Sequence, residues 1–123
     1  SAIREMEEKD RNRVLEMMRV FYASPAVWSD GSEEIFEADF AACISDSPYL
    51  EGYIFENAQD IQGYAMVAKS FSTEFGKPCV WIEDIYVKKV KDKNASLLDL
   101  NDAIISWIRK ENLSGNIMLS IKN

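Results

Sequence analysis

The sequence predicts an α/β (α+β) domain whose helices and strands follow the order βααβββαβ. Three observations support this prediction: stripes of apolar residues at helical spacing, segments of strand length in the middle of the chain, and turn residues that separate them. With 123 residues, of which 47% are apolar and 28% charged, the chain is long enough for one hydrophobic core. We therefore expect a single domain over residues 1–123.

The first half of the chain contains two predicted helices after a short strand at residues 3–6. Asp10 stands where it can cap a helix over residues 11–22, and residues 24–25, Ser-Pro, end that helix. Residues 30–32 are a predicted turn and N-cap for a second helix. The stripe of the first helix is Val14, Met17, Met18 and Phe21, and that of the second is Ile35, Phe36, Phe40, Cys43 and Ile44.

The second half begins with strands. Residues 49–56 and 61–71 are two predicted strands, and residues 57–60 are their hairpin turn. Residues 76–78 turn the chain into a strand at 79–87, and residues 116–121 form a last short strand. Between them we expect a helix from Asn94 or Ser96 to about Asn112, with a stripe of Leu97, Leu100, Ile104, Trp107 and Ile108.

Composition limits the chemistry. There is no histidine, so the commonest general base and the commonest metal ligand are both missing. No Cys-x-x-Cys pair occurs either, and we expect no metal site. No apolar run approaches the roughly 18 residues that a membrane span needs. Because the N-terminus shows no export signal, we expect a cytoplasmic protein in which Cys43 and Cys79 are reduced.

Charge is unevenly distributed along a chain of net charge −7. Residues 1–60 carry 14 acidic and 5 basic side chains, whereas residues 61–123 carry 7 and 9. An acidic first half disfavours nucleic acid and anionic membranes as partners. It suits a cationic partner such as an amine, although acidic charge that only keeps the protein soluble explains it as well.

Four segments together resemble a known family. Residues 3–6 with the capped helix after them resemble its first strand and helix, and residues 21–27 resemble the substrate-side loop of one bacterial subgroup. Residues 61–66 match its third-strand pattern, hydrophobic-x-Gly-Tyr-Ala, and residues 81–87 match its fourth, hydrophobic-Glu-Asp-Leu-Tyr-Val. Over nearly its whole length the chain is similar to a GNAT-type N-acetyltransferase. The resemblance implies a three-layer fold, with a mostly antiparallel mixed sheet between helices on both faces, and acetyl transfer from acetyl-CoA to an amine.

The resemblance also implies where acetyl-CoA binds. In this family a Gln/Arg-x-x-Gly-x-Gly/Ala loop follows the fourth strand and cradles the pyrophosphate with backbone N–H groups, for which glycine allows close approach. Here the motif falls on residues 92–97, where Asp92, Ala95 and Leu97 occupy its defining positions. We expect this departure to weaken or abolish acetyl-CoA binding. The nearby lysines at 88, 89, 91 and 93 either attract phosphates or only solvate the loop. The implied loop contacts are Lys93, Asn94, Ala95, Ser96 and Leu97.

The fourth strand carries the remaining cofactor and catalytic candidates. By resemblance, the main chain of Ile85, Tyr86 and Val87 binds the pantetheine arm like an added strand, a contact that survives side-chain change. Acetyl transfer to an amine needs a base, and the candidates are Glu83 and Asp84. Strict alternation would place residues 81, 83, 85 and 87 on one face and 82, 84 and 86 on the other. The two carboxylates would then point apart, and each has an alternative role as a satisfied strand carboxylate.

The acceptor side and the partners complete the prediction. Phe21, Tyr22, Trp28 and Tyr64 could line a pocket for a small-molecule amine or a peptide N-terminus, or they could be core residues. The family continues past the fifth strand with a further arm, whereas this sequence stops at Asn123. The strand at 116–121 would then have an open edge, and we expect a homodimer. Two other hypotheses stay open: a catalytically inactive acetyltransferase-like binding module, and an unrelated α+β domain.

Overall fold

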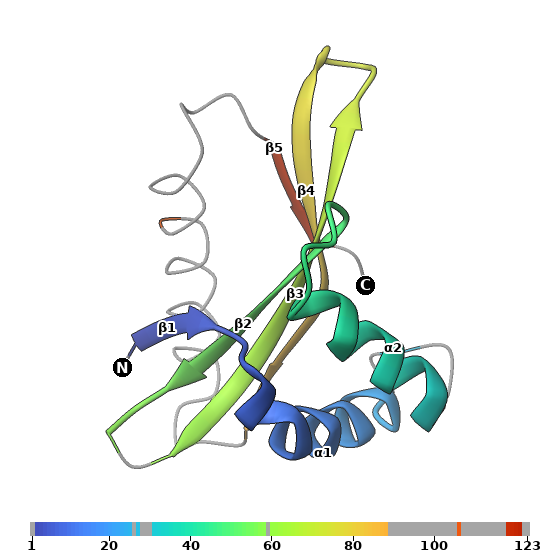
Figure 1. Ribbon diagram of the computed structural model, residues 1–123. Coiled ribbons are helices and arrows are strands. Elements are labelled where there is room, and N and C mark those ends of the chain that lie inside the picture. Colours follow the sequence, from blue (N-terminus) through green and yellow to red (C-terminus); the bar gives the residue numbers. More distant parts are fainter. Residues whose placement is uncertain are drawn as a thin grey trace.

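The computed structural model describes residues 2–25, 27, 31–58, 60–88, 106 and 118–121. The helices are α1 (Arg11–Tyr22), preceded by the 3-10 turn η1 (Glu8–Asp10), and α2 (Glu33–Cys43). The strands are β1 (Ala2–Glu5), β2 (Leu50–Glu56), β3 (Ile61–Ser72), β4 (Lys77–Val87) and β5 (Met118–Ile121) (Figure 1). Each expected element outside residues 89–117 is therefore present, and the bounds of α1 agree with the prediction.

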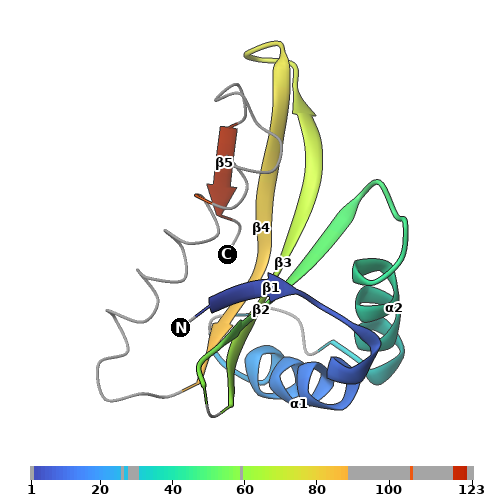
Figure 2. The same ribbon diagram turned by 60° about the vertical axis from the view of Figure 1, so that its left-hand side comes forward.

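The five strands form one mixed sheet in the order β1-β2-β3-β4-β5. The first four are antiparallel to their neighbours, and β5 is parallel to β4. Both α1 and α2 lie on the same face of the sheet (Figure 2). The α+β class with a mostly antiparallel sheet is confirmed. The helix expected between β4 and β5 falls outside the described residues except for Ser106, which is helical.

The core has two parts, one on each face of the sheet. The part beneath the helices contains Val14, Met18 and Phe40, none of them solvent-exposed, packed on Ile54 and Met66. The part on the opposite face consists of Tyr53, Phe55, Ala65, Val67, Val80, Ile82 and Val87. The predicted stripe of α2 is wrong at Ile35, which is 51% exposed, because the buried face of α2 is the one that carries Phe36 and Phe40.

The predicted turns and caps are largely present. The Ser32 hydroxyl accepts from the Ile35 amide at 3.2 Å, as an N-cap should. Gly31, with a φ of +68°, turns the chain into α2. At the β2–β3 hairpin the amide of Asp60 donates to the side chain of Asn57 at 2.9 Å. The turn before β4 spans residues 73–76, so that Lys77 already belongs to the strand.

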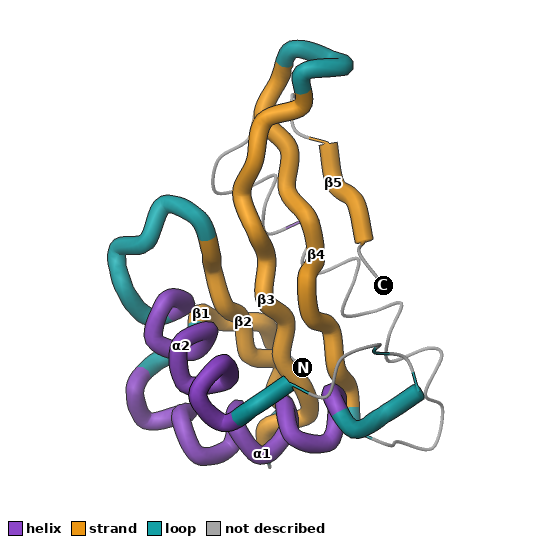
Figure 3. The backbone as a smooth tube through the Cα atoms, turned by 90° about the vertical axis from the view of Figure 1, so that its right-hand side faces the viewer, coloured by secondary structure: helices purple, strands orange, loops and turns teal. Residues whose placement is uncertain are grey.

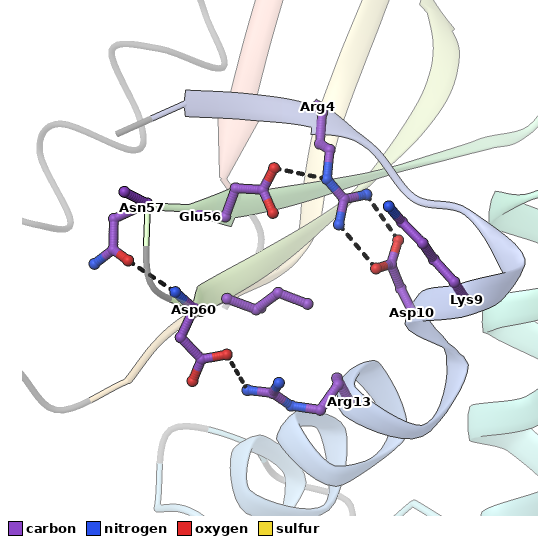
Figure 4. Close-up of a pocket in the computed structure, with 9 residues that line it drawn as sticks. Arg4, Lys9, Asp10, Arg13, Glu56, Asn57 and Asp60 are labelled. Atoms are coloured by element: carbon purple, nitrogen blue, oxygen red, sulfur yellow. Dashed lines mark hydrogen bonds and ion pairs between the residues drawn. The ribbon is translucent and has the colours of Figure 1, made fainter.

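Asp10 serves a different purpose from the one predicted. It precedes α1 but makes no side-chain capping bond to that helix. Its carboxylate, 2% exposed, accepts two hydrogen bonds from Arg4, at 2.8 and 2.9 Å, and one from the amide of Glu7 at 2.8 Å. Arg4 also donates to Glu56 on β2 at 2.9 Å. These side chains line a pocket of about 360 Å³ between β1, η1 and the β2–β3 turn (Figure 4). Arg4 thus fastens β1 to the start of α1 and to β2.

The β3–β4 hairpin extends beyond β2. The register of β2 on β3 runs from Ile61 to Ala68, whereas β3 pairs with β4 as far as Ser72. On the other side of β4, β5 pairs only with Cys79, Val80, Trp81 and Ile82 (Figure 3). From Glu83 to Val87, β4 has no strand on that side in the part of the chain that the structure describes. β4 and β5 are therefore paired at one end only.

Two further expectations concern cysteines and membranes. Cys43 and Cys79 are both free thiols, as predicted. The helices that the structure describes include none with the length and hydropathy to cross a membrane.

We predict that Arg4→Met lowers the free energy of unfolding by about 3 kcal/mol, because it leaves the buried carboxylate of Asp10 without its cationic partner. Burial alone would raise the pKa of Asp10, but the hydrogen bonds and charge of Arg4 outweigh it and the pKa is lowered. A carboxyl group whose pKa is lower in the folded state stabilises the fold at every pH above its unfolded pKa. This contribution is lost as the pH falls through the folded-state pKa. Urea unfolding of the variant and the wild type at pH 7 and at acid pH measures both effects.

Arg19→Met is the matched control. Arg19 pairs with Glu33, and the two side chains are 51% and 60% exposed. Such a surface pair contributes about 0–1 kcal/mol. Equal losses for the two arginine variants would contradict the role given to Arg4.

Candidate functional site

A β-bulge in β4 determines where the candidate carboxylates point. Met66 pairs with Asp84 and Val67 pairs with Ile82, so Glu83 is the extra residue that the bulge inserts between these two pairs. Such an extra residue breaks strand alternation and re-aims the side chains next to it. Ile82 accordingly lies in the core part opposite the helices, together with Ile85 and Val87. The expected grouping of residue 82 with 84 and 86 is therefore wrong.

Asp84 faces the helices and is almost completely buried, at 4% exposure. Its Oδ1 accepts from the Tyr22 hydroxyl at 2.8 Å, and its Oδ2 accepts from the Tyr64 hydroxyl at 2.9 Å. The donors come from the last turn of α1 and from β3. Burial raises the pKa of Asp84, the two tyrosine bonds oppose this effect, and the charge of Glu83 adds to it.

Aromatic rings surround this carboxylate. Tyr22 contacts Phe21 edge-on at 5.1 Å between centroids and Phe36 at 5.2 Å. Tyr64 lies 6.4 Å from Phe21 and 6.2 Å from Tyr86. The structure therefore brings together Phe21, Tyr22 and Tyr64, three of the four predicted acceptor residues. Trp28, the fourth, lies outside the described residues.

Glu83 is half-buried. It lines an open pocket of about 430 Å³ together with Ala68, Lys69, Ser70 and Trp81. The negative charge of Glu83 raises the pKa of Asp84. It also raises the pKa of Tyr22, although burial and the charge and hydrogen bond of Asp84 have larger effects on that group. Glu83 and Asp84 are therefore electrostatically coupled. We expected them to act apart because of strict strand alternation, and the bulge breaks that alternation.

Asp39 on α2 is an acidic neighbour that the sequence prediction missed. Burial and, to a smaller extent, the negative charges of Asp84 and Glu83 raise its pKa to about 6. Within the described ranges no hydrogen bond or ion pair to Asp39 occurs, so its nearest charges are repulsive. The signal in the sequence was weak, because an Asp in the middle of an acidic helix is usually a solvated residue.

Gly63 explains part of the hydrophobic-x-Gly-Tyr-Ala pattern. A Cβ at this position would lie 2.2 Å from the carbonyl oxygen of Tyr86, so only glycine lets β3 approach β4 this closely. The main chain of Ile85, Tyr86 and Val87 pairs with β3 on this side. Along its opposite edge, the part of the chain that the structure describes has no strand. This edge is where the resemblance implies the pantetheine arm.

The other predicted cofactor contacts, Lys93, Asn94, Ala95, Ser96 and Leu97, lie outside the described residues, and so does the expected pyrophosphate loop. In the described part of the chain, no group of three or more Cys, Asp and Glu side chains is placed to hold a metal ion.

Comparison with known proteins gives matches by structure only. No protein-family model matches the chain, and no curated protein matches it by sequence. A possible acetyltransferase from Clostridium difficile 630 is 14% identical, with a TM-score of 0.76 over 99% of this chain and 78% of its own. A GNAT family acetyltransferase from Staphylococcus aureus is 11% identical, with a TM-score of 0.72 over 99% and 85%. AAC(6')-Iy, solved with the bisubstrate analogue CoA-S-monomethyl-acetylneamine, is 17% identical, with a TM-score of 0.72 over 99% and 79%.

These matches confirm that the chain has the GNAT acetyltransferase fold. The hypothesis of an unrelated α+β fold is therefore excluded. At 11–17% identity the likeness shows the fold and does not by itself carry an activity.

We predict that Asp39→Asn stabilises the protein at pH 7.5 by roughly 1 kcal/mol, a value that allows for solvent screening of this half-buried group. An acid whose folded pKa is raised weakens the fold once the pH exceeds that pKa, and has no such effect below the unfolded value. The gain should therefore vanish near pH 3.8, the ordinary value for the group, and be complete above pH 6. Urea unfolding across this range measures it. A gain that does not depend on pH would contradict the repulsion from Asp84 and Glu83.

Proposed function

We propose that the chain binds acetyl-CoA and transfers its acetyl group to an amine. The observation that carries this proposal is the edge of β4 at Ile85, Tyr86 and Val87, along which the described part of the chain places no further strand, beside two carboxylates and a cluster of aromatic rings. An open strand edge can accept an extended ligand arm through main-chain hydrogen bonds. The GNAT fold supports the same reading, since AAC(6')-Iy of this fold was solved with a CoA-containing analogue.

The cofactor would contact β4 first. Main-chain groups of Ile85, Tyr86 and Val87 would bind the pantetheine arm, a contact that no side-chain substitution removes. The pyrophosphate would approach Lys93, Asn94, Ala95, Ser96 and Leu97. Because Asp92 places a negative charge near an anionic ligand and Leu97 limits close backbone approach, we propose weak rather than tight binding.

The base would be Glu83, with Asp84 beside it. An acceptor ammonium must lose a proton before its nitrogen can attack the thioester carbonyl. The new C–N bond forms as the C–S bond breaks, and the departing thiolate of CoA takes up a proton. Glu83 is the better-placed carboxylate because it is half-buried and lines an open pocket, whereas both oxygens of Asp84 already accept hydrogen bonds.

The acceptor would be a small-molecule amine or a peptide N-terminus. Asp39, Glu83 and Asp84 concentrate negative charge near Tyr22 and Tyr64, and an ammonium group would relieve their mutual repulsion. Phe21 and Trp28 would complete the walls of the site. The overall charge of −7 favours the approach of a cation and disfavours nucleic acid and anionic membranes.

We predict that saturating acetyl-CoA stabilises the protein by about 2.7 kcal/mol at 100 times its dissociation constant. Thermal-shift titration up to millimolar cofactor measures this, and transfer to a panel of amines is assayed by CoA release. Glu83→Gln should lower kcat by about 100-fold or more, because it removes the base. It should leave the cofactor-induced shift unchanged, since the main-chain contacts remain.

Glu74→Gln, an exposed change at the β3–β4 turn, is the matched control and should retain wild-type turnover. Absence of any thermal shift at millimolar acetyl-CoA would reject the transferase. Cofactor binding without transfer to any amine would favour the alternative, an inactive acetyltransferase-like binding module.

We also propose that residues 1–123 act as one cytoplasmic domain that forms a homodimer. β5 is short, and on the side away from β4 it pairs with no strand that the structure describes. Such an edge favours pairing with another strand. Light scattering at tens of micromolar protein should give twice the chain mass of 14.1 kDa, and a monomer at that concentration would contradict the proposal.

A further inference from the structure

Trp81 is an exposed aromatic residue close to the proposed base. Its side chain is 40% exposed, although its backbone lies within β4 and pairs with Ala68 on β3 and Ser120 on β5. The next residue, Ile82, is fully buried in the core part opposite the helices. Because side chains alternate along a strand, Trp81 points to the face of the sheet that carries α1 and α2. A strand that is paired on both sides therefore presents an indole ring on the same face as Asp84.

Small side chains leave room in front of this ring. Ala68 and Ser70 line the same open pocket of about 430 Å³ as Trp81 and Glu83. Ala68 lies opposite Trp81 in the β3–β4 ladder, and an alanine side chain is too small to cover an indole. A single exposed aromatic residue needs no explanation by itself. An exposed ring and a carboxylate in one pocket, however, both attract a cation.

The basic residue of this pocket is engaged elsewhere. Lys69 is the one basic side chain among the described residues that line the pocket. Its Nζ pairs with Glu51 at 2.6 Å. Its ladder partner on β4, Val80, belongs to the core part opposite the helices. Because ladder partners share a face of the sheet, Lys69 is directed to the other side and does not offer its charge to a ligand on Trp81.

The charges near Trp81 favour a cation without a carboxylate of its own. Glu83 is close enough to Asp39 and Asp84 for the three carboxylates to repel one another. An ammonium group relieves this repulsion, whereas a further carboxylate adds to it. A carboxylate has about four lone-pair sites, so an ammonium can bind Glu83 beside any group that already contacts it.

We propose that the ammonium group of the acceptor binds between the indole ring of Trp81 and the carboxylate of Glu83, and that the acceptor carries an apolar group and no carboxylate next to its nitrogen. The apolar group would pack on Ala68 and the remainder of the indole. Arylalkylamines and peptide N-termini have this chemistry, whereas free amino acids do not. The inference rests on the proposed function, since Glu83 acts there as the base. It makes Trp81 a specificity-determining residue.

The test measures amine binding by NMR titration in the absence of acetyl-CoA, so that it does not need turnover. Backbone amide shifts give the Kd of phenethylamine for the wild type, Trp81→Phe and Trp81→Leu. Three further ligands share its ring: phenethyl alcohol has no charge, phenylalanine adds a carboxylate, and phenylalanine amide mimics a peptide N-terminus. The indole N–H resonance of Trp81, identified by its absence in Trp81→Phe, reports where the amine binds.

Phe71→Leu is the matched control variant. Phe71 is an aromatic residue of the same hairpin, 59% exposed, and it does not line the pocket. Urea unfolding confirms that each variant is folded. Should Trp81→Leu fail to fold, Trp81→Phe and the indole resonance of the wild type decide.

We expect Trp81→Leu to raise the Kd and the acceptor KM of phenethylamine about fivefold, and Trp81→Phe about twofold, since a smaller ring keeps part of the cation–π attraction. The kcat should stay within about twofold, because the base and the main chain of β4 are unaltered. Phenylalanine should bind about 10-fold more weakly than phenethylamine, and phenylalanine amide about equally well. Trp81→Phe and Trp81→Leu should bind phenethyl alcohol alike, and Phe71→Leu should keep the wild-type values. The indole resonance of Trp81 should shift as phenethylamine is added.

Three results would each overturn the inference. The first is the same Kd of phenethylamine in the wild type and Trp81→Leu. The second is an indole resonance of Trp81 that does not shift during the titration. The third is equal binding of phenethylamine and phenylalanine, because the site would then accept a carboxylate.

The proposed function stands or falls on a separate measurement. A wild type that transfers acetyl to amines keeps the proposed function, even where one of those three results overturns the role of Trp81. A wild type that binds phenethylamine at Trp81 and transfers acetyl to no amine rejects the proposed function and leaves the amine site in place.

Discussion

The structure depends on one buried negative charge being fully hydrogen-bonded. Asp84 lies under α1 in the middle of an apolar core part, where an unsatisfied carboxylate would oppose folding. Tyr22 and Tyr64 supply the two hydroxyl donors, and to do so the end of α1 must lie over β4 at the height of the bulge. The position of α1 on the sheet and the packing of the aromatic rings both agree with that requirement.

A second charged group, Arg4, fixes the position of the other end of α1. Arg4 joins β1 to Asp10 at the start of the helix and to Glu56 on β2. The two groups differ in kind, because Asp10 is held by an opposite charge and Asp84 only by neutral hydroxyls. This difference explains why the pKa of Asp10 is lowered and that of Asp84 is raised, although both are nearly fully buried.

Local signals in the sequence predicted most of the elements and fewer of the contacts. Helical spacing of Val14, Met17 and Met18 located α1, and Ser32 located the start of α2, because both signals act within a few residues. The bulge at Glu83 was not predicted, since a strand with an extra residue has the same composition as one without it. Asp10 was expected to cap a helix, and only the fold shows that Arg4 comes near enough to bind it. The proximity of Asp39 to Asp84 and Glu83 also arises from the fold, and no local sequence pattern predicts it.

The tyrosines that would shape the acceptor site are also part of the packed interior of the protein. Tyr64 is fully buried and packs with Met18 and Met66 in the core part beneath the helices. Natural selection or a designer therefore cannot change these positions for a new acceptor without also changing the stability of the fold. Half-buried Asp39 is less constrained in this respect. Divergence in substrate preference within such a scaffold should accumulate at Asp39, while the aromatic rings and the proposed base remain.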